Sequence, residues 1–397
     1  MVDDDPVFAA FVEQLVLSLG AEFPCTLQWV DSAERGLEEL GRASYDLVLL
    51  DYHLPGADGL HVLAQIRELP TAQQPAVIML TGSGNESVAV EAMKRGAKDY
   101  LCKAGLEVAP LLRVLNSALT QKQLEDQVAS YNTQMRADLE LARRLQQSLL
   151  PVRFPVFRAD GALGDSALRF EPRFIPAMDL AGDFFSVLAL SESQAGVFIC
   201  DVMGHGVRSA LVTAMMHALV ENEAPRTPDP GEFLAALNRR LTRLIQPEEG
   251  PMYVTAFYGI ADVATGQLRY ANAGHPRPLH LRRRLGTADA LPAPRPAGPA
   301  LGMYPDANYG TGECSLEVGD VLLLFTDGLY EVASADGAED YGKARLQAAA
   351  KENLRLPAGA LCEALIGDVR RFSGRAEFAD DVCLLGVDVV RLANGGS

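Results

Sequence analysis

Four aspartates in the last two-thirds of this 397-residue chain have similar local settings, each beside an apolar run or a glycine turn: Asp183, Asp201, Asp327 and Asp380. Carboxylates are the ligands that Mg²⁺ and Mn²⁺ prefer, and four of them can bridge two cations. Two metals lower the pKa of a shared water, and the resulting hydroxide can attack phosphorus in line. The pattern predicts two-metal hydrolysis of a phosphate ester; the alternative is a set of unrelated surface acids.

A second group of reactive side chains lies in the first third. Three apolar runs end in Asp51, Thr81 and Lys103, and Asp3 and Asp4 stand near the start. Apolar runs that alternate with helical periodicity predict a doubly wound parallel α/β sheet, in which ligands bind beyond the carboxyl ends of the strands. Acids, a hydroxyl and an amine gathered there suit Mg²⁺ and a phosphoryl group carried on a carboxylate.

This ordered set resembles the response-regulator receiver domain across the first third of the chain. The resemblance implies a phospho-acceptor, Asp51, and an acidic pair that helps to hold Mg²⁺, Asp3 and Asp4. It also implies three switch residues: Thr81, Tyr100 and Lys103. A sensor histidine kinase or another phosphodonor would phosphorylate the domain, adding charge that biases a two-state face.

Two departures from the receiver pattern carry expectations. Only Met1 and Val2 precede Asp3, so the first strand is nearly missing and its neighbours should lack ladder partners. Either the true start lies upstream, or the receiver is compromised. Ala104 stands where the family has proline after the lysine. Because a cis bond without proline costs about 3–4 kcal/mol, we expect a trans bond or a rearranged loop.

The region 151–391 contains, in this order, the stretches LAGDFF, CDVMGHG, NAGHPRPL, GDVLLLFTDGLYE and DDVCLL. With these stretches the region resembles the PPM family of metal-dependent serine/threonine phosphatases, in its SpoIIE-like branch that acts on anti-anti-sigma factors. The resemblance implies an α+β fold, a β-sandwich flanked by helices, with two Mn²⁺ or Mg²⁺. The implied metal ligands are Asp183, Asp201, the Val202 carbonyl, Asp327 and Asp380.

Two further residues are candidates in this region. Asp381 adjoins a ligand, and its role is open. His205 either protonates the leaving oxygen, which suits a group with a pKa near 6.5, or is a turn residue. His275 is interpreted as structural. Ala181 replaces a glycine of the family signature, a change that removes no ligand.

A helical linker joins the two regions. Residues 111–149 contain no glycine or proline, and apolar residues recur at spacings of mostly three and four. A long helix with one apolar stripe cannot bury that stripe alone, which favours a parallel homodimeric coiled coil; the alternative is a helix packed onto one domain. The predicted organisation is a receiver, a coiled-coil linker, a phosphatase domain and a tail: residues 1–110, 111–150, 151–391 and 392–397.

Composition excludes several classes of protein. The net charge of −17 argues against a nucleic-acid partner, because phosphate contacts need clustered lysine and arginine. With no apolar run of membrane-spanning length and no signal peptide, we expect a cytoplasmic protein that does not bind membranes. The proline-rich segment 282–302, with its arginine run, predicts an exposed, mobile loop.

These observations favour one function over two others. The first is a response regulator whose output is dephosphorylation of a phosphoserine or phosphothreonine protein, by resemblance a STAS-type anti-anti-sigma factor, under control of Asp51. The second is an adaptor whose phosphatase-like domain binds a sigma factor or its regulators without turnover. The third is a scaffold built on the coiled coil. Retention of all four acids favours the enzyme.

Overall fold

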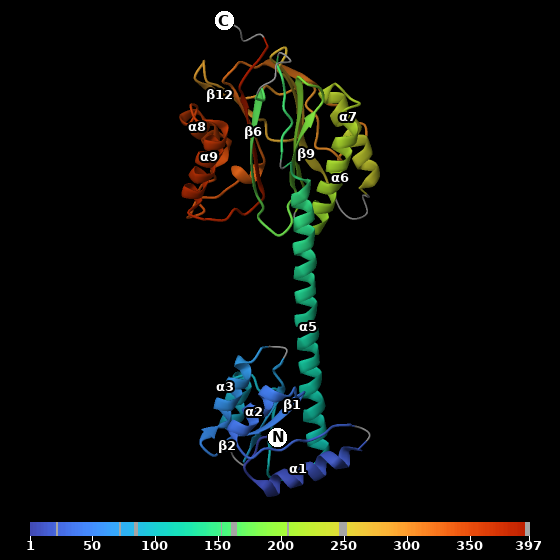
Figure 1. Ribbon diagram of the computed structural model, residues 1–397, viewed down its shortest axis with the longest axis vertical. Helices are drawn as coiled ribbons and strands as arrows, with labels where there is room; N and C mark the ends of the chain where they lie inside the picture. Colours follow the sequence, from blue (N-terminus) through green and yellow to red (C-terminus); the bar gives the residue numbers. More distant parts are fainter. Residues whose placement is uncertain are drawn as a thin grey trace. The chain divides into compact units, whose positions relative to one another are not determined.

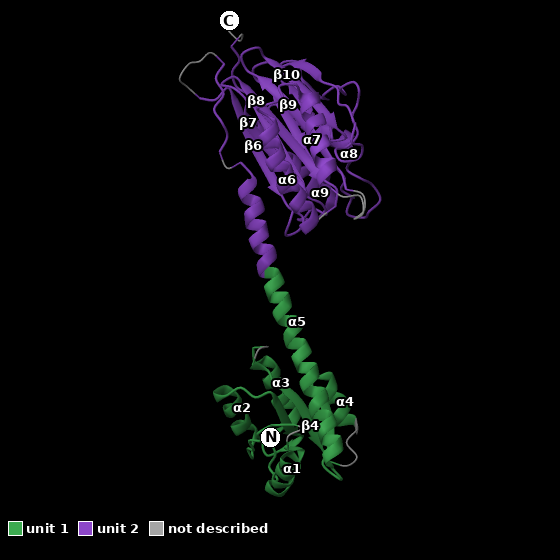
Figure 2. Ribbon diagram, turned by 90° about the vertical axis from the view of Figure 1, so that its right-hand side faces the viewer, with its two compact units in different colours: residues 1–136 green, residues 137–397 purple. Residues whose placement is uncertain are grey.

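A computed structural model of the chain describes residues 1–20, 23–70, 73–82, 86–151, 153–159, 165–204, 206–245 and 252–393. Contacts between residues divide the chain into two compact units, Met1–Arg136 and Ala137–Ser397, which are coloured separately in Figure 2. Across the described residues, no helix combines the length and the apolar character needed to cross a membrane.

Unit 1 is built on a parallel sheet with the strand order β1–β4–β5. Its strands are β1 (Leu47–Asp51), β4 (Ala76–Thr81) and β5 (Asp99–Cys102), with a small hairpin of β2 (His53–Leu54) and β3 (Ala57–Asp58). Its helices are α1 (Pro6–Leu19), α2 (Ala33–Arg42), α3 (Gly59–Glu68), α4 (Glu86–Lys94) and the first part of α5 (Val108–Leu149). The predicted doubly wound receiver fold is confirmed.

Helices cover both faces of the sheet of unit 1. Successive strand residues point to opposite faces, so residues of both positions are buried. On β1, Leu49 packs with α1 and α5, whereas Val48 and Leu50 pack with α2 and α3. Continuous apolar strands are therefore required here, as in other parallel sheets covered by helices.

The first strand of the sheet is reduced to a bridge at Val2. The Val2 amide donates to the Leu49 carbonyl at 2.9 Å, and the Val2 carbonyl accepts from the Asp51 amide at 2.9 Å. On its other side Val2 bridges Val30. This pairing holds Asp3 next to Asp51, and a cavity of about 1540 Å³ borders β1 further along. The expectation that ladder partners are lacking is therefore corrected at Val2 itself.

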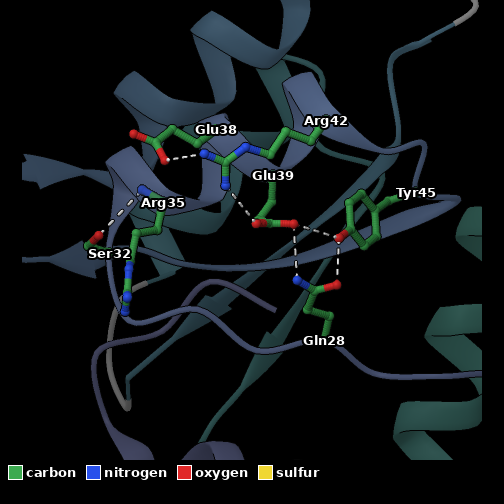
Figure 3. A network of polar contacts seen from close by, with 7 residues as sticks. All are labelled: Gln28, Ser32, Arg35, Glu38, Glu39, Arg42 and Tyr45. Carbon is green, nitrogen blue, oxygen red and sulfur yellow. Dashed lines mark hydrogen bonds and ion pairs between the residues drawn. The ribbon is translucent and has the colours of Figure 1, made fainter.

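A polar network fixes the segment that pairs with the first residues (Figure 3). The Gln28 side chain donates to Glu39 on α2 at 3.1 Å and accepts from the Tyr45 hydroxyl at 2.7 Å. Arg42 donates to the other oxygen of Glu39 at 3.3 Å. The Gln28 carbonyl accepts from the Met1 ammonium at 2.7 Å. Helix α2 thus anchors the segment on which Met1 is held.

Helix α5 changes character along its 42 residues. Leu111 and Leu115 are buried in the core of unit 1. Further along, the predicted apolar stripe is exposed: Leu124 and Val128 are each 58 % exposed, and Tyr131 is 75 % exposed. A lone helix seldom leaves such a stripe uncovered, so the coiled coil stays a prediction that this exposure favours.

Unit 2 is a sandwich of two five-stranded antiparallel sheets. The first sheet has the order β13 (Gly312–Ser315), β10 (Gln267–Ala273), β9 (Val254–Asp262), β8 (Gln194–Val202) and β7 (Asp183–Ala189). The second has the order β12 (Thr287–Ala290), β11 (Leu279–Arg282), β14 (Val321–Phe325), β15 (Val382–Val389) and β6 (Leu168–Ile175). The predicted α+β sandwich is confirmed.

Helices cover the outer face of each sheet (Figure 1). Helices α6 (Val207–Glu223) and α7 (Pro230–Leu244) pack on the first sheet. Helices α8 (Gly342–Glu352) and α9 (Ala358–Ser373) pack on the second. A third core between the sheets includes Phe185, Ile199 and Leu385. The sandwich therefore holds its strand ends rigidly, which suits a site built from those ends.

The segment 282–302 is not the exposed loop that its composition predicts. It contains β12, and Ala288, Leu291 and Leu301 are buried. Leu301 exchanges two backbone hydrogen bonds with Val254, at 2.9 and 2.8 Å. Tertiary pairing overrides the local signal of prolines and arginines in this segment.

Candidate functional site

The acids of unit 1 meet a lysine at the carboxyl end of the parallel sheet. Lys103 Nζ lies 2.7 Å from Asp3 Oδ2 and 2.8 Å from Asp51 Oδ2. Asp3 and Asp51 are buried, whereas Asp4 is exposed. One oxygen from each of Asp3, Asp4 and Asp51 lies within 4.8 Å of the other two. The structure thus brings together the predicted phospho-acceptor, acidic pair and lysine, while their roles stay predictions.

The remaining switch candidates sit on neighbouring strands. Thr81 is buried at the end of β4, and its hydroxyl donates to the Leu101 carbonyl at 3.5 Å. Tyr100 on β5 is 45 % exposed. The bond between Lys103 and Ala104 is trans, as expected, since the cis bond among the described residues lies elsewhere in the chain.

Charge balance in unit 1 depends on the lysine. Burial raises the pKa of Asp3, and the hydrogen bond from Lys103 opposes that rise. The Lys103 ammonium also lies 4.9 Å from the centre of the Phe8 ring. The donor set of three carboxylates consists of hard oxygen ligands, which fits Mg²⁺.

The acids of unit 2 come from the ends of four strands in both sheets. Asp183 begins β7 and lies opposite Asp201 of β8 in the antiparallel register. Asp327 follows β14 after Thr326, and Asp380 shortly precedes β15, which pairs with β14. Val202 ends β8 and is buried. Short apolar strands thus deliver each acid at one end of the sandwich.

A hydroxyl joins the two sheets at this end. Thr326 Oγ1 donates to Asp183 Oδ2 at 2.6 Å and accepts from the Cys383 amide at 2.9 Å. A side chain at Gly328 would place its Cβ 2.0 Å from the Asp381 carbonyl oxygen, so only glycine lets these two turns approach. A Cβ at Gly182 would likewise lie 2.8 Å from the Val202 carbonyl oxygen. The turns that carry the acids are therefore in direct contact.

Both carboxylate oxygens of Asp381 accept hydrogen bonds from the backbone. Its Oδ1 accepts from the Ala177 amide at 2.8 Å, and its Oδ2 accepts from the Gly182 amide at 2.7 Å. Both oxygens are thus engaged with the loop that leads to Asp183. We assign Asp381 the role of positioning that loop.

Burial, with mutual repulsion second, raises the pKa values of the acids of unit 2. Burial, followed by the charge of Asp327, raises the pKa of Asp201 to about 7. Burial and then the charge of Asp201 raise the pKa of Asp183 well above its usual range. Burial, then the charges of Glu331 and Asp380, raise the pKa of Asp327. Divalent cations would offset this repulsion, so the hard oxygen donors fit Mn²⁺ or Mg²⁺.

The spread of these acids differs from that in unit 1. Within the described residues, the tight trio of carboxylates is the one in unit 1. The four aspartates of unit 2 influence one another electrostatically: Asp183, Asp201, Asp327 and Asp380. Asp380 is exposed, whereas Asp183 is buried.

Of the two histidines considered from the sequence, the structure describes one. His205 lies outside the described residues. His275 is buried, its Nδ1 lies 2.8 Å from Thr255 Oγ1, and burial lowers its pKa to about 3. Its amide donates to Asn272 Oδ1 at 2.9 Å. His275 is therefore a neutral structural residue, as interpreted from the sequence.

Sequence reasoning missed two residues that organise the site. Thr326 immediately precedes Asp327, but nothing in its local pattern shows that its hydroxyl reaches Asp183 across the sandwich. Gln146, in the linker helix, contacts the backbone of Ala181. Both contacts depend on tertiary packing, so only a signal across many related sequences could have found them.

Comparison with protein families identifies the chain. The family described as Stage II sporulation protein E (SpoIIE) matches residues 191–390, and the response regulator receiver domain matches residues 1–135. The chain belongs to the SpoIIE family, whose phosphatase domains are of the PPM type, and it carries an N-terminal receiver domain. The family predictions made from the sequence are confirmed.

The curated relatives include proteins named as phosphatases and one named as a regulator. Phosphoserine phosphatase RsbP of Bacillus subtilis is 29 % identical over 255 residues, 64 % of this chain and 58 % of RsbP. Phosphoserine phosphatase RsbU of the same organism is 28 % identical over 51 % of this chain and 56 % of RsbU. The chain thus spans somewhat over half the length of these relatives. Regulator of RpoS from Escherichia coli is 23 % identical over 65 % of this chain and 77 % of that protein.

A solved structure supports the fold of unit 2. The SiaA-PP2C domain of Pseudomonas aeruginosa matches with a TM-score of 0.54 and 22 % identity, over 65 % of this chain and 98 % of that one. At this identity the match shows the fold alone.

Proposed function

We propose that this protein is a two-component response regulator whose output is metal-dependent dephosphorylation of a phosphoserine or phosphothreonine protein. The observation that carries the proposal is the arrival of four aspartates from separate strands at one end of the sandwich, where burial and mutual repulsion raise the pKa of three of them. Acids held in this way are poised for cations rather than for structural ion pairs. The relatives named phosphoserine phosphatases support the same reaction.

In this proposal some residues hold the cations and others position those residues. Asp183, Asp201, the Val202 carbonyl, Asp327 and Asp380 would hold two Mn²⁺ or Mg²⁺. Thr326 fixes the Asp183 carboxylate, and Asp381 fixes the loop before it. When bound, such cations lower the pKa of a water and stabilise negative charge on a phosphoryl group. No covalent protein intermediate is needed.

The receiver would set the rate of this reaction. A histidine kinase or another phosphodonor would phosphorylate Asp51, with Mg²⁺ held by Asp3 and Asp4. The added charge would compete for Lys103, which now pairs with Asp3 and Asp51. Helix α5 would carry the change to unit 2, and its exposed stripe would pair two copies of the chain in a homodimer. We place the activity in the cytoplasm, with a STAS-type anti-anti-sigma factor as substrate.

The test is phosphate release from such a phosphoprotein with the full chain and Mn²⁺. We expect Asp201→Asn and Asp327→Asn to lower kcat by roughly 10³-fold or more, because each removes a charge that the cations need. Asp336→Asn is the matched control, since Asp336 is an exposed aspartate whose hydrogen-bond acceptor survives the change. Turnover that persists in the Asp201 and Asp327 variants would refute the metal assignment.

Similarity to Regulator of RpoS supports a second candidate, an adaptor that binds a sigma factor without turnover. The adaptor predicts that a sigma factor is captured equally with Mn²⁺, with a chelator, and by the Asp327→Asn variant. The enzyme predicts phosphate release that disappears in the last two conditions. Measuring both on the same preparations separates the two functions.

A further inference from the structure

Both backbone polar groups of Gly182, the residue before Asp183, are hydrogen-bonded. The Gly182 amide donates to Asp381, and the Gly182 carbonyl accepts from the Thr213 hydroxyl at 3.0 Å and from the Val202 amide at 3.2 Å. These anchors belong to the sandwich and to α6. One residue earlier, Ala181 is anchored from a different part of the chain.

That anchor is the side chain of Gln146, in the last turn of helix α5. Gln146 Nε2 donates to the Ala181 carbonyl at 2.6 Å, and the Ala181 amide donates to Gln146 Oε1 at 3.0 Å. One side-chain amide therefore satisfies both polar groups of one residue, as a neighbouring strand would. A shift of Gln146 must move Ala181 or break both bonds.

Ala181 makes this contact costly to break. The residue is 1 % exposed, so water cannot replace a lost partner. A buried N–H or C=O without a partner loses the full free energy of its hydration. Ala181 must therefore move together with the end of α5. Asp183 is two residues further along the same backbone.

We propose that Gln146 is a positioning residue through which helix α5 sets the placement of Asp183 and hence the affinity of unit 2 for Mn²⁺ or Mg²⁺. The inference rests on the proposed function and adds the route by which the linker regulates it. While Gln146 makes both hydrogen bonds to Ala181, Asp183 is held for cation binding. When these bonds break, the loop keeps its hydrogen bonds at Gly182 but loses those at Ala181. Gln146 touches no reacting group, and it acts through Ala181.

The chain supplies its own control one residue away. Gln147 has the same side chain and lies in the same helical turn, but it is exposed. Gln146→Met keeps the length and helix propensity of the side chain and removes both hydrogen bonds. Gln147→Met makes the same chemical change without touching Ala181. Gln146→Glu keeps an acceptor for the Ala181 amide and loses the donor to its carbonyl.

The experiment uses the full chain and two readouts. Free Mn²⁺ is measured by electron paramagnetic resonance during titration to give a dissociation constant, and kcat and KM are measured for phosphoprotein hydrolysis. For Gln146→Met we expect a dissociation constant about tenfold higher, the effect of one or two lost hydrogen bonds, with an unchanged KM. Gln146→Glu should fall between Gln146→Met and the wild type, and Gln147→Met should match the wild type.

The outcomes separate this inference from the proposed function. Equal Mn²⁺ dissociation constants for the wild type, Gln146→Met and Gln147→Met would overturn the inference while leaving the enzyme intact. If Gln146→Met does not fold, the Gln146→Glu variant decides: an Mn²⁺ affinity equal to that of the wild type overturns the inference, and a weaker one supports it. A wild type that binds Mn²⁺ but releases no phosphate would instead refute the proposed function.

Discussion

Both acid sites of this chain bring carboxylates close together, and the two sites differ in how the negative charge is balanced. In the receiver, Asp3 and Asp51 share the Lys103 ammonium at 2.7 and 2.8 Å. In the phosphatase domain, the largest charges that act on Asp201 from the described residues are those of carboxylates. The receiver therefore carries an internal cation that balances its acids at rest. In our proposal, the phosphatase site takes cations from solution for the same balance.

This difference matches the chemistry that we propose for each site. A receiver must be stable without its phosphoryl group, because the unphosphorylated form is one of its two working states. A two-metal hydrolase needs an open, strongly negative site, because a built-in lysine would compete with the metals for the same oxygens.

Removing the internal cation should destabilise the receiver unit. Lys103→Met leaves two buried carboxylates facing each other, and loss of one partner of a buried pair costs about 3 kcal/mol. Urea unfolding of the full chain, followed by signals from each unit, should show an earlier transition for unit 1 alone. Lys94→Met, at the end of α4, is the control. An unchanged unit 1 transition would mean that Lys103 does not balance these acids.

Supplying cations should stabilise the other unit. A ligand that binds only the folded state at a hundred times its dissociation constant adds about 2.7 kcal/mol. Mn²⁺ should therefore raise the thermal midpoint of unit 2 by roughly 5–10 °C, given its size. Calorimetry with Mn²⁺ and with a chelator measures the shift, and Asp201→Asn should abolish it. A shift of equal size in that variant would place the bound cations elsewhere.

The hydroxyl that joins the sheets should have a smaller effect. Thr326→Val keeps the shape of the side chain but leaves the buried Asp183 carboxylate without this donor, at a cost of about 2 kcal/mol. We expect a loss of unit 2 stability of that size together with weaker Mn²⁺ binding. Thr326→Ser retains the hydroxyl and should stay near the wild type. If serine and valine behave alike, the bond to Asp183 contributes nothing.

The sequence was informative where chemistry is local. Apolar runs that end in Asp51, Asp201 and Asp327 predicted strands with acids at their ends, because burial on both faces forces continuous apolar residues. Those acids do lie at strand ends, so both folds and the grouping of the acids were predictable. The role of Asp381 could not be predicted, because the hydrogen bond that it accepts from the Gly182 amide depends on how two distant turns pack.

Other features could not be predicted because long-range pairing decides them. The segment 282–302 forms β12 and pairs Leu301 with Val254, although its prolines and arginines indicate an exposed loop. Val2 provides a bridge where only a gap was expected, because α2 and Gln28 hold a partner beside it. Local propensity is a weak guide when a neighbouring strand satisfies the backbone.

The two acid sites should also differ in how they respond to pH. The pKa of Asp201 is about 7 in the folded protein, above its usual value near 4, so the folded state retains a proton that the unfolded state has lost between those values. Without metal, the stability of unit 2 should therefore fall as pH rises from about 4 to 7 and level off above 7. Because Mn²⁺ must displace that proton, its dissociation constant should rise by up to tenfold for each pH unit below 7. Titrations of Mn²⁺ at pH 5.5, 6.5 and 7.5 measure this slope, and a flat profile would mean that the acids are already ionised. In the receiver, where Lys103 stands in for the cation, a weaker dependence is expected over the same range.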